Sequence, residues 1–169
     1  MNTNLHSKEV DDLKALGFVG FRPITELTLN TAIIPNIQGV YCVLYSQDDE
    51  PDFVEPGCGG HFKGKDPNVS KAVLQQSWVS TSNIIYIGKA GGAGKKASLR
   101  SRLSQYFRFG QGKNIGHWGG RFIWQIEHSD QLTICWKQLT DEDARSVEGH
   151  MIEEFVLKHG RRPFANLAP

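Results

Sequence analysis

One stretch of this chain, residues 84–107 (IIYIGKAGGAGKKASLRSRLSQYF), constrains its fold most. It opens with four β-branched or aromatic residues in a row, which predicts a strand that ends near Gly88. A glycine-rich turn follows through Gly94. Ser98 can then cap a helix, because apolar residues recur after it at steps of three and four. These residues are Leu99, Leu103, Tyr106 and Phe107.

The same stretch lies in a segment of one charge sign. Residues 67–126 contain no acidic residue and nine basic ones. The basic residues are Lys71, Lys89, Lys95, Lys96, Arg100, Arg102, Arg108, Lys113 and Arg121. This concentration indicates a surface that meets phosphate, with a solvated basic face as the alternative. Because acids cluster just upstream in 48–55 and the net charge is only +1, we expect local contact with nucleic acid rather than indiscriminate coating.

The size and composition of the chain are those of an ordinary globular domain. With 169 residues and 39% hydrophobic content, the chain is long enough to bury a core, and we expect a single domain over 1–169. The longest apolar run, residues 40–45, is far shorter than a membrane span. The N-terminus lacks the pattern of a secretory signal, and the three cysteines form no motif. We therefore expect a cytoplasmic protein with reduced thiols and no membrane partner.

The segment that precedes this stretch contains one clear strand. Residues 39–45 (GVYCVLY) form an unbroken apolar run, which predicts a buried strand. Ahead of it we expect a helical extension over 1–36, with a helix at 7–17 and irregular structure in 21–36.

Three further segments complete the expected organisation. Residues 46–82 are partly acidic and glycine-rich, and we interpret them as an insertion with one helix at 66–76. Residues 122–128 and 132–139 are predicted to be two strands joined by a short turn. The last helix is expected over 140–159, with Gly160 as its stop.

The final predicted helix carries an acid where an apolar residue is expected. At about 100° per residue, Glu148 projects within roughly 20° of Phe155, in the middle of the apolar face. An ionised carboxylate directed at a core is costly unless a positive charge compensates it. This pattern favours a functional acid, and a structural ion pair with an arginine is the alternative.

Five motifs in order resemble those of GIY-YIG nucleases. They are GVY at 39–41, YIGKA at 86–90, LRSRLSQYF at 99–107, Glu148 and Asn166. The pairing of the second and third motifs is most similar to the nuclease domain of the excision-repair incision subunit. The resemblance spans residues 37–167, as core segments 37–45 and 83–167 separated by the insertion 46–82. This insertion departs from the short hairpin that usually joins the first two motifs in the family.

The resemblance implies an α+β fold, with a small three-stranded, largely antiparallel sheet flanked by helices. It implies metal-dependent hydrolysis of DNA phosphodiester bonds with Mg²⁺ or Mn²⁺ and without an organic cofactor. Glu148 would then hold the metal and Arg102 would contact the scissile phosphate. Tyr41 and Tyr86 would lie near the attacking water. The implied supporting residues are Gly88, Lys89 and Asn166.

These residue types suit the implied chemistry. A single carboxylate can hold Mg²⁺ while waters and phosphate oxygens fill the other positions, and the arginine fork matches phosphate geometry. A tyrosine in water has a pKa near 10, which is too high for an efficient base at neutral pH. We expect Lys89 and the metal to favour the phenolate. Either tyrosine can be the base, and we favour Tyr41.

Several basic residues outside the motifs are expected to bind DNA. They are Lys95, Lys96, Arg100 and Arg108 of the turn and helix, and His117 and Arg121 of the loop GHWGGR (116–121). His117 and Arg121 can donate to phosphate and Trp118 can stack on a base, whereas a purely structural turn with Trp118 in the core is the alternative.

Two rival functions follow from the same sequence. A non-catalytic nucleic-acid-binding module would share the fold and the basic surface, but it would be expected to lack the acid or the arginine. A nucleotide-binding protein would use the glycine turn as a P-loop. That motif needs four residues between its glycines and a hydroxyl after the lysine, whereas Gly88 and Gly94 enclose five and Lys96 occupies the hydroxyl position.

Overall fold

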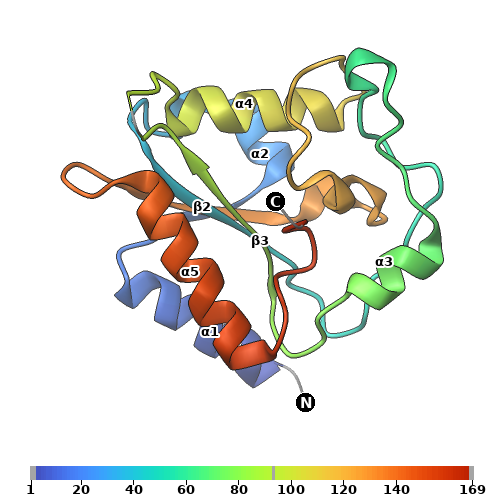
Figure 1. The fold of residues 1–169 in the computed structure, drawn as a ribbon. Helices are drawn as coiled ribbons and strands as arrows, with labels where there is room; N and C mark the ends of the chain where they lie inside the picture. The colour runs from blue at the N-terminus through green and yellow to red at the C-terminus, as the bar shows by residue number, and fades with distance from the viewer. Residues whose placement is uncertain (1–2, 93, 168–169) are drawn as a thin grey trace.

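The sheet of this protein has four antiparallel strands in the order β1-β4-β2-β3 (Figure 1). The computed structural model describes residues 3–92 and 94–167. The strands are β1 (Val19–Pro23), β2 (Gly39–Leu44), β3 (Ile84–Ala90) and β4 (Thr133–Gln138). The α+β class is confirmed, but the expectation of three strands is wrong. The additional strand, β1, lies within the segment that was expected to be helical and irregular.

Strand β2 is the centre of the fold because both of its edges are paired. It pairs with β3 on one side and β4 on the other, and all six of its residues are buried. This explains why its sequence is uninterrupted by polar residues. The β2–β3 register places Tyr41 opposite Gly88 and Val43 opposite Tyr86, so these four residues share one face of the sheet.

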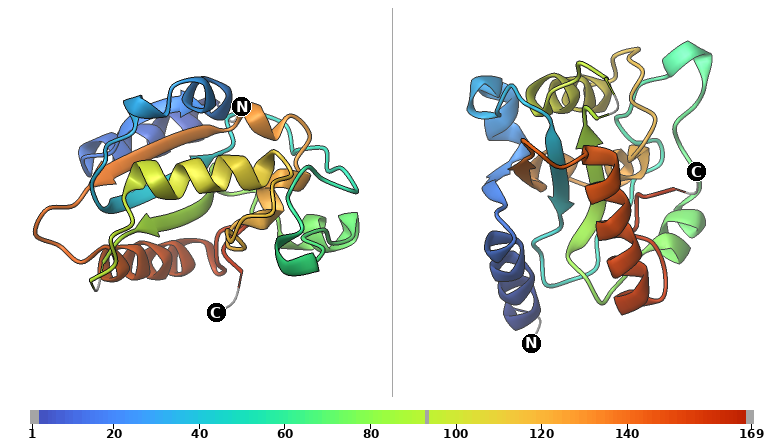
Figure 2. Two further views of the ribbon diagram at one scale, coloured as in Figure 1. Left: turned by 90° about the horizontal axis from the view of Figure 1, so that it is seen from above. Right: turned by 60° about the vertical axis from the view of Figure 1, so that its left-hand side comes forward.

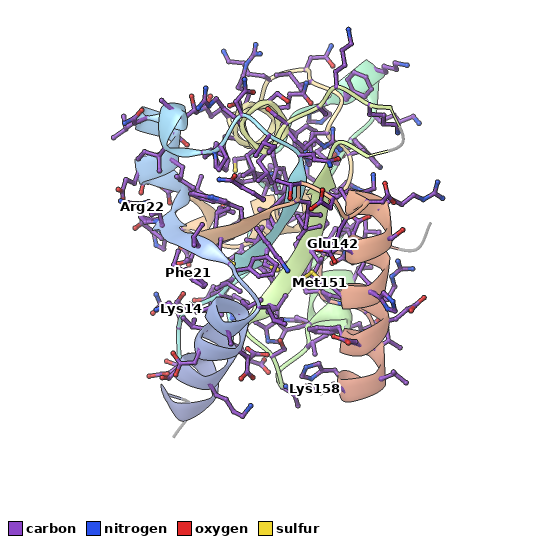
Figure 3. The ribbon with its side chains drawn as sticks, turned by 90° about the vertical axis from the view of Figure 1, so that its left-hand side faces the viewer. Lys14, Phe21, Arg22, Glu142, Met151 and Lys158 are labelled. Carbon is purple, nitrogen blue, oxygen red and sulfur yellow. The ribbon has the colours of Figure 1, made fainter. Side chains whose placement is uncertain are left out.

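Two layers of helices cover the sheet. The helices are α1 (Thr3–Ala15), α2 (Ile24–Leu29), α3 (Lys71–Ser77), α4 (Leu99–Gly110) and α5 (Ala144–His159). Helices α2 and α4 pack on the face that carries Tyr41 and Tyr86, whereas α1 and α5 pack on the other face against Val40, Cys42 and Leu44 (Figure 2). Helix α5 lies alongside the edge strand β3. Figure 3 shows α1 and α5 flanking a shallow groove, with Met151 on its α5 side.

The predicted helices form, with shifted starts. Ser98 caps α4 as expected, and its hydroxyl and that of Ser101 make a reciprocal capping box. Helix α5 begins after Asp143, whose carboxylate accepts from Ser146 N, and it ends at Gly160 with φ of 76°. Helix α3 begins after Ser70 rather than at residue 66. Helix α1 begins at Thr3 instead of residue 7.

The strand expected at 122–128 is wrong. Residues Arg121–Gln125 form a 3₁₀ helix, η3, and the next residues pair with the insertion rather than with β4. Val54 N donates to Gln125 O and Glu127 N donates to Asp52 O, both at 2.8 Å. Since an unalternating apolar run fits a buried strand or a buried helical turn equally well, the pattern alone cannot separate the two.

The insertion 46–82 is built into the same core. Phe53 stacks on Phe164 at 5.7 Å, and Trp78 packs edge-on against Tyr45 at 5.2 Å between ring centroids. Three further 3₁₀ turns connect the elements: η1 (Thr31–Ile33), η2 (Phe62–Gly64) and η4 (Ser129–Gln131). Within the described residues, no helix is both long enough and apolar enough to span a bilayer.

Candidate active site

Tyr41 and Tyr86 meet on one face of the sheet. Tyr41 comes from β2 and Tyr86 from β3, and their ring centroids lie 6.0 Å apart at an interplanar angle of 63°. The Tyr41 ring lies directly over Gly88 on the neighbouring strand, so that a Cβ atom at this position would overlap its Cζ and hydroxyl. The glycine of the YIG motif therefore leaves the space that the tyrosine of the GVY motif occupies.

We predict that Gly88→Ala displaces Tyr41 and destabilises the fold. An added methyl group in a packed core costs about 1–3 kcal/mol, because neighbouring side chains leave their preferred rotamers. Urea unfolding measures this effect.

Gly149→Ala is the matched control, because a Cβ there meets nothing within 4 Å and the residue lies inside α5. Alanine should stabilise that position by about 0.5–1 kcal/mol. A Gly88→Ala variant as stable as Gly149→Ala would contradict the close approach of Tyr41.

A third tyrosine, Tyr106 of α4, completes the cluster. Its ring centroid lies 6.4 Å from that of Tyr41 and 5.7 Å from that of Tyr86. Its hydroxyl donates to Gly120 O at 2.6 Å. The sequence placed Tyr106 only in the apolar stripe of the helix. Its spacing of four from Arg102 is the signal that could have assigned it to the site, because residues i and i+4 share a helix face.

Arg102 lies on the same face of α4 as Tyr106. Its side chain is half-buried, and its closest described partner is Gln105 Oε1, 3.5 Å from Nη1. The positive charge of Arg102 lowers the pKa of both Tyr41 and Tyr86, although burial outweighs it. The guanidinium is therefore close enough to the tyrosines to share one site with them.

Burial keeps both phenols protonated. It raises the pKa of Tyr86 to about 12, with a smaller contribution from the negative charge of Glu148. Burial also raises the pKa of Tyr41 well above its usual value, and the neighbouring Tyr86 raises it further. Both shifts favour the protonated phenol at neutral pH, and added positive charge nearby would act in the opposite direction, toward the phenolate.

Glu148 lies half-buried on the first part of α5. Burial is the largest influence on its carboxyl group and raises its pKa. Four positive charges oppose this effect, in the order Lys89, Arg102, Arg145 and Arg162. Lys89 was expected to act on the tyrosines. It is instead the largest of the positive charges that lower the pKa of Glu148. Arg145 and Arg162 were not predicted as site residues; Arg145 precedes Glu148 by three positions on the helix.

Asn166 holds β3 in place rather than facing the tyrosines. Its amide makes two hydrogen bonds to the backbone of Ile87: Oδ1 accepts from the N–H at 2.9 Å and Nδ2 donates to the carbonyl at 2.8 Å. Ala165 N adds a third bond to Ile85 O at 2.8 Å. The segment that contains Asn166 thereby covers the outer edge of the strand that carries Tyr86, Gly88 and Lys89.

The expected DNA-binding cations divide into exposed and engaged ones. Lys95, Lys96 and Arg108 are exposed near the two ends of α4. Arg100 instead donates to two backbone carbonyls, with Nε at 2.8 Å from Ile34 O and Nη2 at 3.2 Å from Ala32 O. Arg100 therefore ties α4 to η1 and contributes to the fold.

The loop 116–121 packs directly on the tyrosine cluster, but His117 is fully buried and does not reach the surface. Its ring stacks on Tyr106 at 4.2 Å, and Nδ1 lies 3.1 Å from Gly119 O. Burial, reinforced by the charge of Arg102, lowers the pKa of His117 to about 3. The expectation that His117 donates to phosphate is corrected accordingly. Arg121 is half-buried and lies over the Trp118 ring at 4.5 Å.

We expect the neutral state of His117 to make stability fall in acid. The unfolded imidazole takes up a proton near pH 6.5, whereas the folded one stays neutral to about pH 3, so stability decreases as the pH drops through this window. The loss from this group between pH 6.5 and 4.5 is about 2 kcal/mol. In His117→Phe, which retains a ring on Tyr106, the loss should be smaller by that amount. Urea unfolding of both proteins at each pH tests this, and equal losses would contradict a buried neutral imidazole.

The residues of this site include one possible metal ligand, so the substrate and waters would have to fill the other coordination positions of an ion. Glu148 offers a hard carboxylate oxygen, and the described residues contain no group of three or more His, Cys, Asp or Glu that could hold an ion by themselves. Mg²⁺ commonly uses one or two carboxylates together with waters and substrate phosphates. A single carboxylate would hold such an ion only together with waters and phosphate oxygens, and it is unlike a closed structural zinc site.

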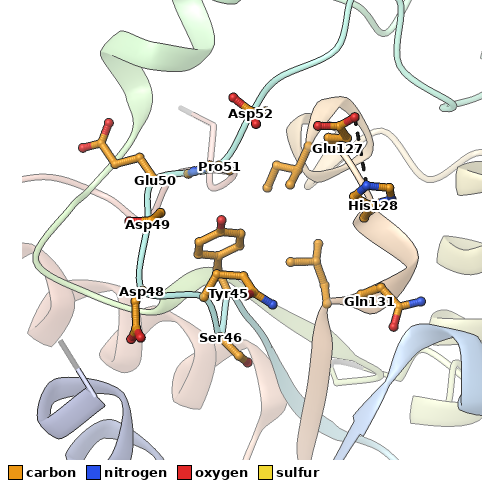
Figure 4. A pocket seen from close by; sticks show the side chains of 13 residues that line it. Tyr45, Ser46, Asp48, Asp49, Glu50, Pro51, Asp52, Glu127, His128 and Gln131 are labelled. Carbon is orange, nitrogen blue, oxygen red and sulfur yellow. Dashed lines mark ion pairs between the residues drawn. The ribbon is translucent and has the colours of Figure 1, made fainter. Parts of the chain in front are cut away.

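An acidic hollow lies elsewhere, at the opposite end of β2 (Figure 4). It is formed by the start of the insertion, residues 46–52, against residues 126–132. Its acids are Asp48, Asp49, Glu50, Asp52 and Glu127. A wall of this charge repels phosphate, so we do not assign the hollow to the same function.

No family model matches the chain, and no match is found among the curated proteins or the solved structures. The likeness to GIY-YIG nucleases therefore remains one of five ordered motifs.

Proposed function

We propose that this protein is a metal-dependent endonuclease of the GIY-YIG type that hydrolyses DNA phosphodiester bonds. The observation that supports the proposal is that Tyr41 of β2 and Tyr86 of β3 meet with ring centroids 6.0 Å apart, and that the charges of Arg102 from α4 and Glu148 from α5 both act on the pKa of these two phenols. Structural packing does not require an acid, an arginine and buried phenols to share a site. The phosphodiester hydrolysis proposed here would use all three.

In this proposal each residue has a distinct role. Arg102 binds the scissile phosphate through its fork and stabilises the charge that develops on the phosphoryl oxygens. Glu148 would hold the metal, and the chemistry that such an ion would supply is a lowered pKa of bound water and neutralisation of negative charge. Tyr41, as the phenolate, would receive the proton of the attacking water, and Tyr86 is the neighbouring phenol, with its ring centroid 6.0 Å away. The water oxygen bonds to phosphorus and the bond to the sugar oxygen breaks; that oxygen takes a proton from solvent water, and the Tyr41 phenol later returns its proton to solvent.

The raised pKa values of the tyrosines explain why this site depends on a cation. Without added positive charge both phenols stay protonated and no base is available. The single acid and the cations around it supply a place where metal and phosphate can enter together.

Incubation of the purified protein with supercoiled plasmid and Mg²⁺ or Mn²⁺ tests the proposal. Nicked or linear product should form, should require the metal, and should disappear with a chelator. DNA binding without cleavage under all these conditions would instead favour a non-catalytic nucleic-acid-binding module with the same fold.

A further inference from the structure

Two loops that are far apart in the sequence form one projecting unit, which we call the basic lobe. It consists of residues 59–65 of the insertion, which include η2, and residues 111–116, which follow α4 (Figure 1). Backbone and side-chain contacts join the two loops. Gly60 N donates to Phe109 O at 2.9 Å, Lys63 N donates to Asn114 Oδ1 at 3.2 Å, and Gly116 lies against the Phe62 ring.

The basic lobe carries three lysines whose charges are not paired with carboxylates within the described residues. Lys63, Lys65 and Lys113 are all exposed, and within the described part of the chain no carboxylate pairs with any of them. The nearest acid in the sequence, Asp66, accepts from the backbone N–H and the side-chain amide of Asn68, at 2.9 and 2.7 Å, and lies 3.6 Å from His61 Nε2 rather than pairing with a lysine of the lobe. The three ammonium groups are therefore available to an external anion.

The position of the basic lobe relative to the candidate active site indicates which kind of anion its lysines would bind. The lobe adjoins the C-terminal end of α4, while Lys95 and Lys96 precede its N-terminal end, and Arg102 lies between them. A helix of this length spans about 18 Å, which corresponds to about five base pairs of DNA. Cations at both ends and an arginine between them match a polyanion that passes along α4.

We propose that the basic lobe is a second contact surface for duplex DNA, on one side of the cleavage position, and that this contact is a function of the insertion. The inference rests on the proposed function. The lobe would bind the phosphate backbone without taking part in the chemistry, because its lysines lie outside the cluster formed by Arg102, the tyrosines and Glu148. The loop 116–121, which links the lobe to that cluster, would hold the two surfaces in register.

Salt-dependent DNA binding by the full chain, in a chelator to prevent cleavage, tests this proposal. The variant is Lys63→Gln/Lys65→Gln/Lys113→Gln. The matched control is Lys8→Gln/Lys14→Gln/Lys158→Gln, which removes the same number of charges from exposed positions on α1 and α5. Figure 3 shows Lys14 and Lys158 on these two helices. Binding of a duplex is followed between roughly 0.05 and 0.3 M salt. The lobe variant should lower the slope of log K against log salt by about two to three, and weaken binding about tenfold per lost contact at 0.1 M salt.

The outcomes separate this inference from the proposed function. A lower slope in the lobe variant alone supports the lobe as a DNA surface. Equal losses of DNA affinity in both variants would mean that only net charge matters. Unchanged affinity in the lobe variant would mean that DNA binds elsewhere. Either result overturns the inference and leaves the nuclease proposal in place. Absence of DNA binding by the unmodified chain would overturn both.

Discussion

Replacement of Glu148 by glutamine is expected to abolish metal-dependent DNA cleavage and to leave the fold intact. The carboxylate is the one acid that the motifs and the geometry both place beside Arg102 and the tyrosines. In the proposed mechanism this change would remove the protein ligand of the metal, and with it the cation that would favour ionisation of one of the phenols. Plasmid cleavage measures the first effect, and thermal unfolding without metal measures the second.

The stability of the Glu148→Gln variant separates a functional acid from a structural one. Burial raises the pKa of this group, which means that the folded environment disfavours its charge. A neutral amide of similar shape should therefore be neutral or mildly stabilising. A large fall in melting temperature would instead identify a structural ion pair with the surrounding cations. Glu153→Gln is the matched control, since Glu153 is exposed on the same helix and contacts His150.

Replacement of Arg102 by alanine is expected to lower the cleavage rate by on the order of 10²–10³-fold, the usual cost of losing one preorganised electrostatic contact in the transition state. The effect should fall mainly on kcat, because the charge on the phosphoryl oxygens grows during the reaction. Single-turnover cleavage at saturating protein separates this from weaker binding.

Arg100→Ala provides the comparison on the same helix. The variant loses two hydrogen bonds to the carbonyls of Ile34 and Ala32, so its stability should fall by about 1–3 kcal/mol. Its cleavage rate should fall much less than that of Arg102→Ala. Equal rate defects would mean that the helix is a diffuse binding surface and that Arg102 has no special position.

The elements that could be predicted from the sequence are those in which the local signals all indicate the same secondary structure. Strand β2 has an unbroken apolar run, and α4 has a serine cap followed by a regular apolar stripe; both occur as expected. Strand β1 has no such signal. It contains glycine and proline, and its pairing with β4 shifts register between Gly20 and Arg22. Its existence depends on a partner strand more than 100 residues later, which no local pattern encodes.

The candidate site shows the same division. The motif residues Tyr41, Tyr86, Arg102 and Glu148 could be named because each motif is read locally. Burial of His117 against Tyr106 could not, since a glycine-rich loop fits both an exposed and a packed conformation. The engagement of Arg100 by backbone carbonyls was missed for a related reason: helical phase indicates a direction, but the segment that lies there comes from another part of the chain.

The pairing of residues 52–54 with 125–127 means that the connection between β2 and β3 is not a detachable module. Gln125 is fully buried, and its side chain is bonded to Val54 O and to both backbone groups of Val69, all within the insertion. Excising that connection to restore a short hairpin would leave these polar groups without partners in an apolar interior. In a shortened version of this protein η3 would have to be redesigned at the same time, because the side chain of Gln125 makes its hydrogen bonds to the insertion.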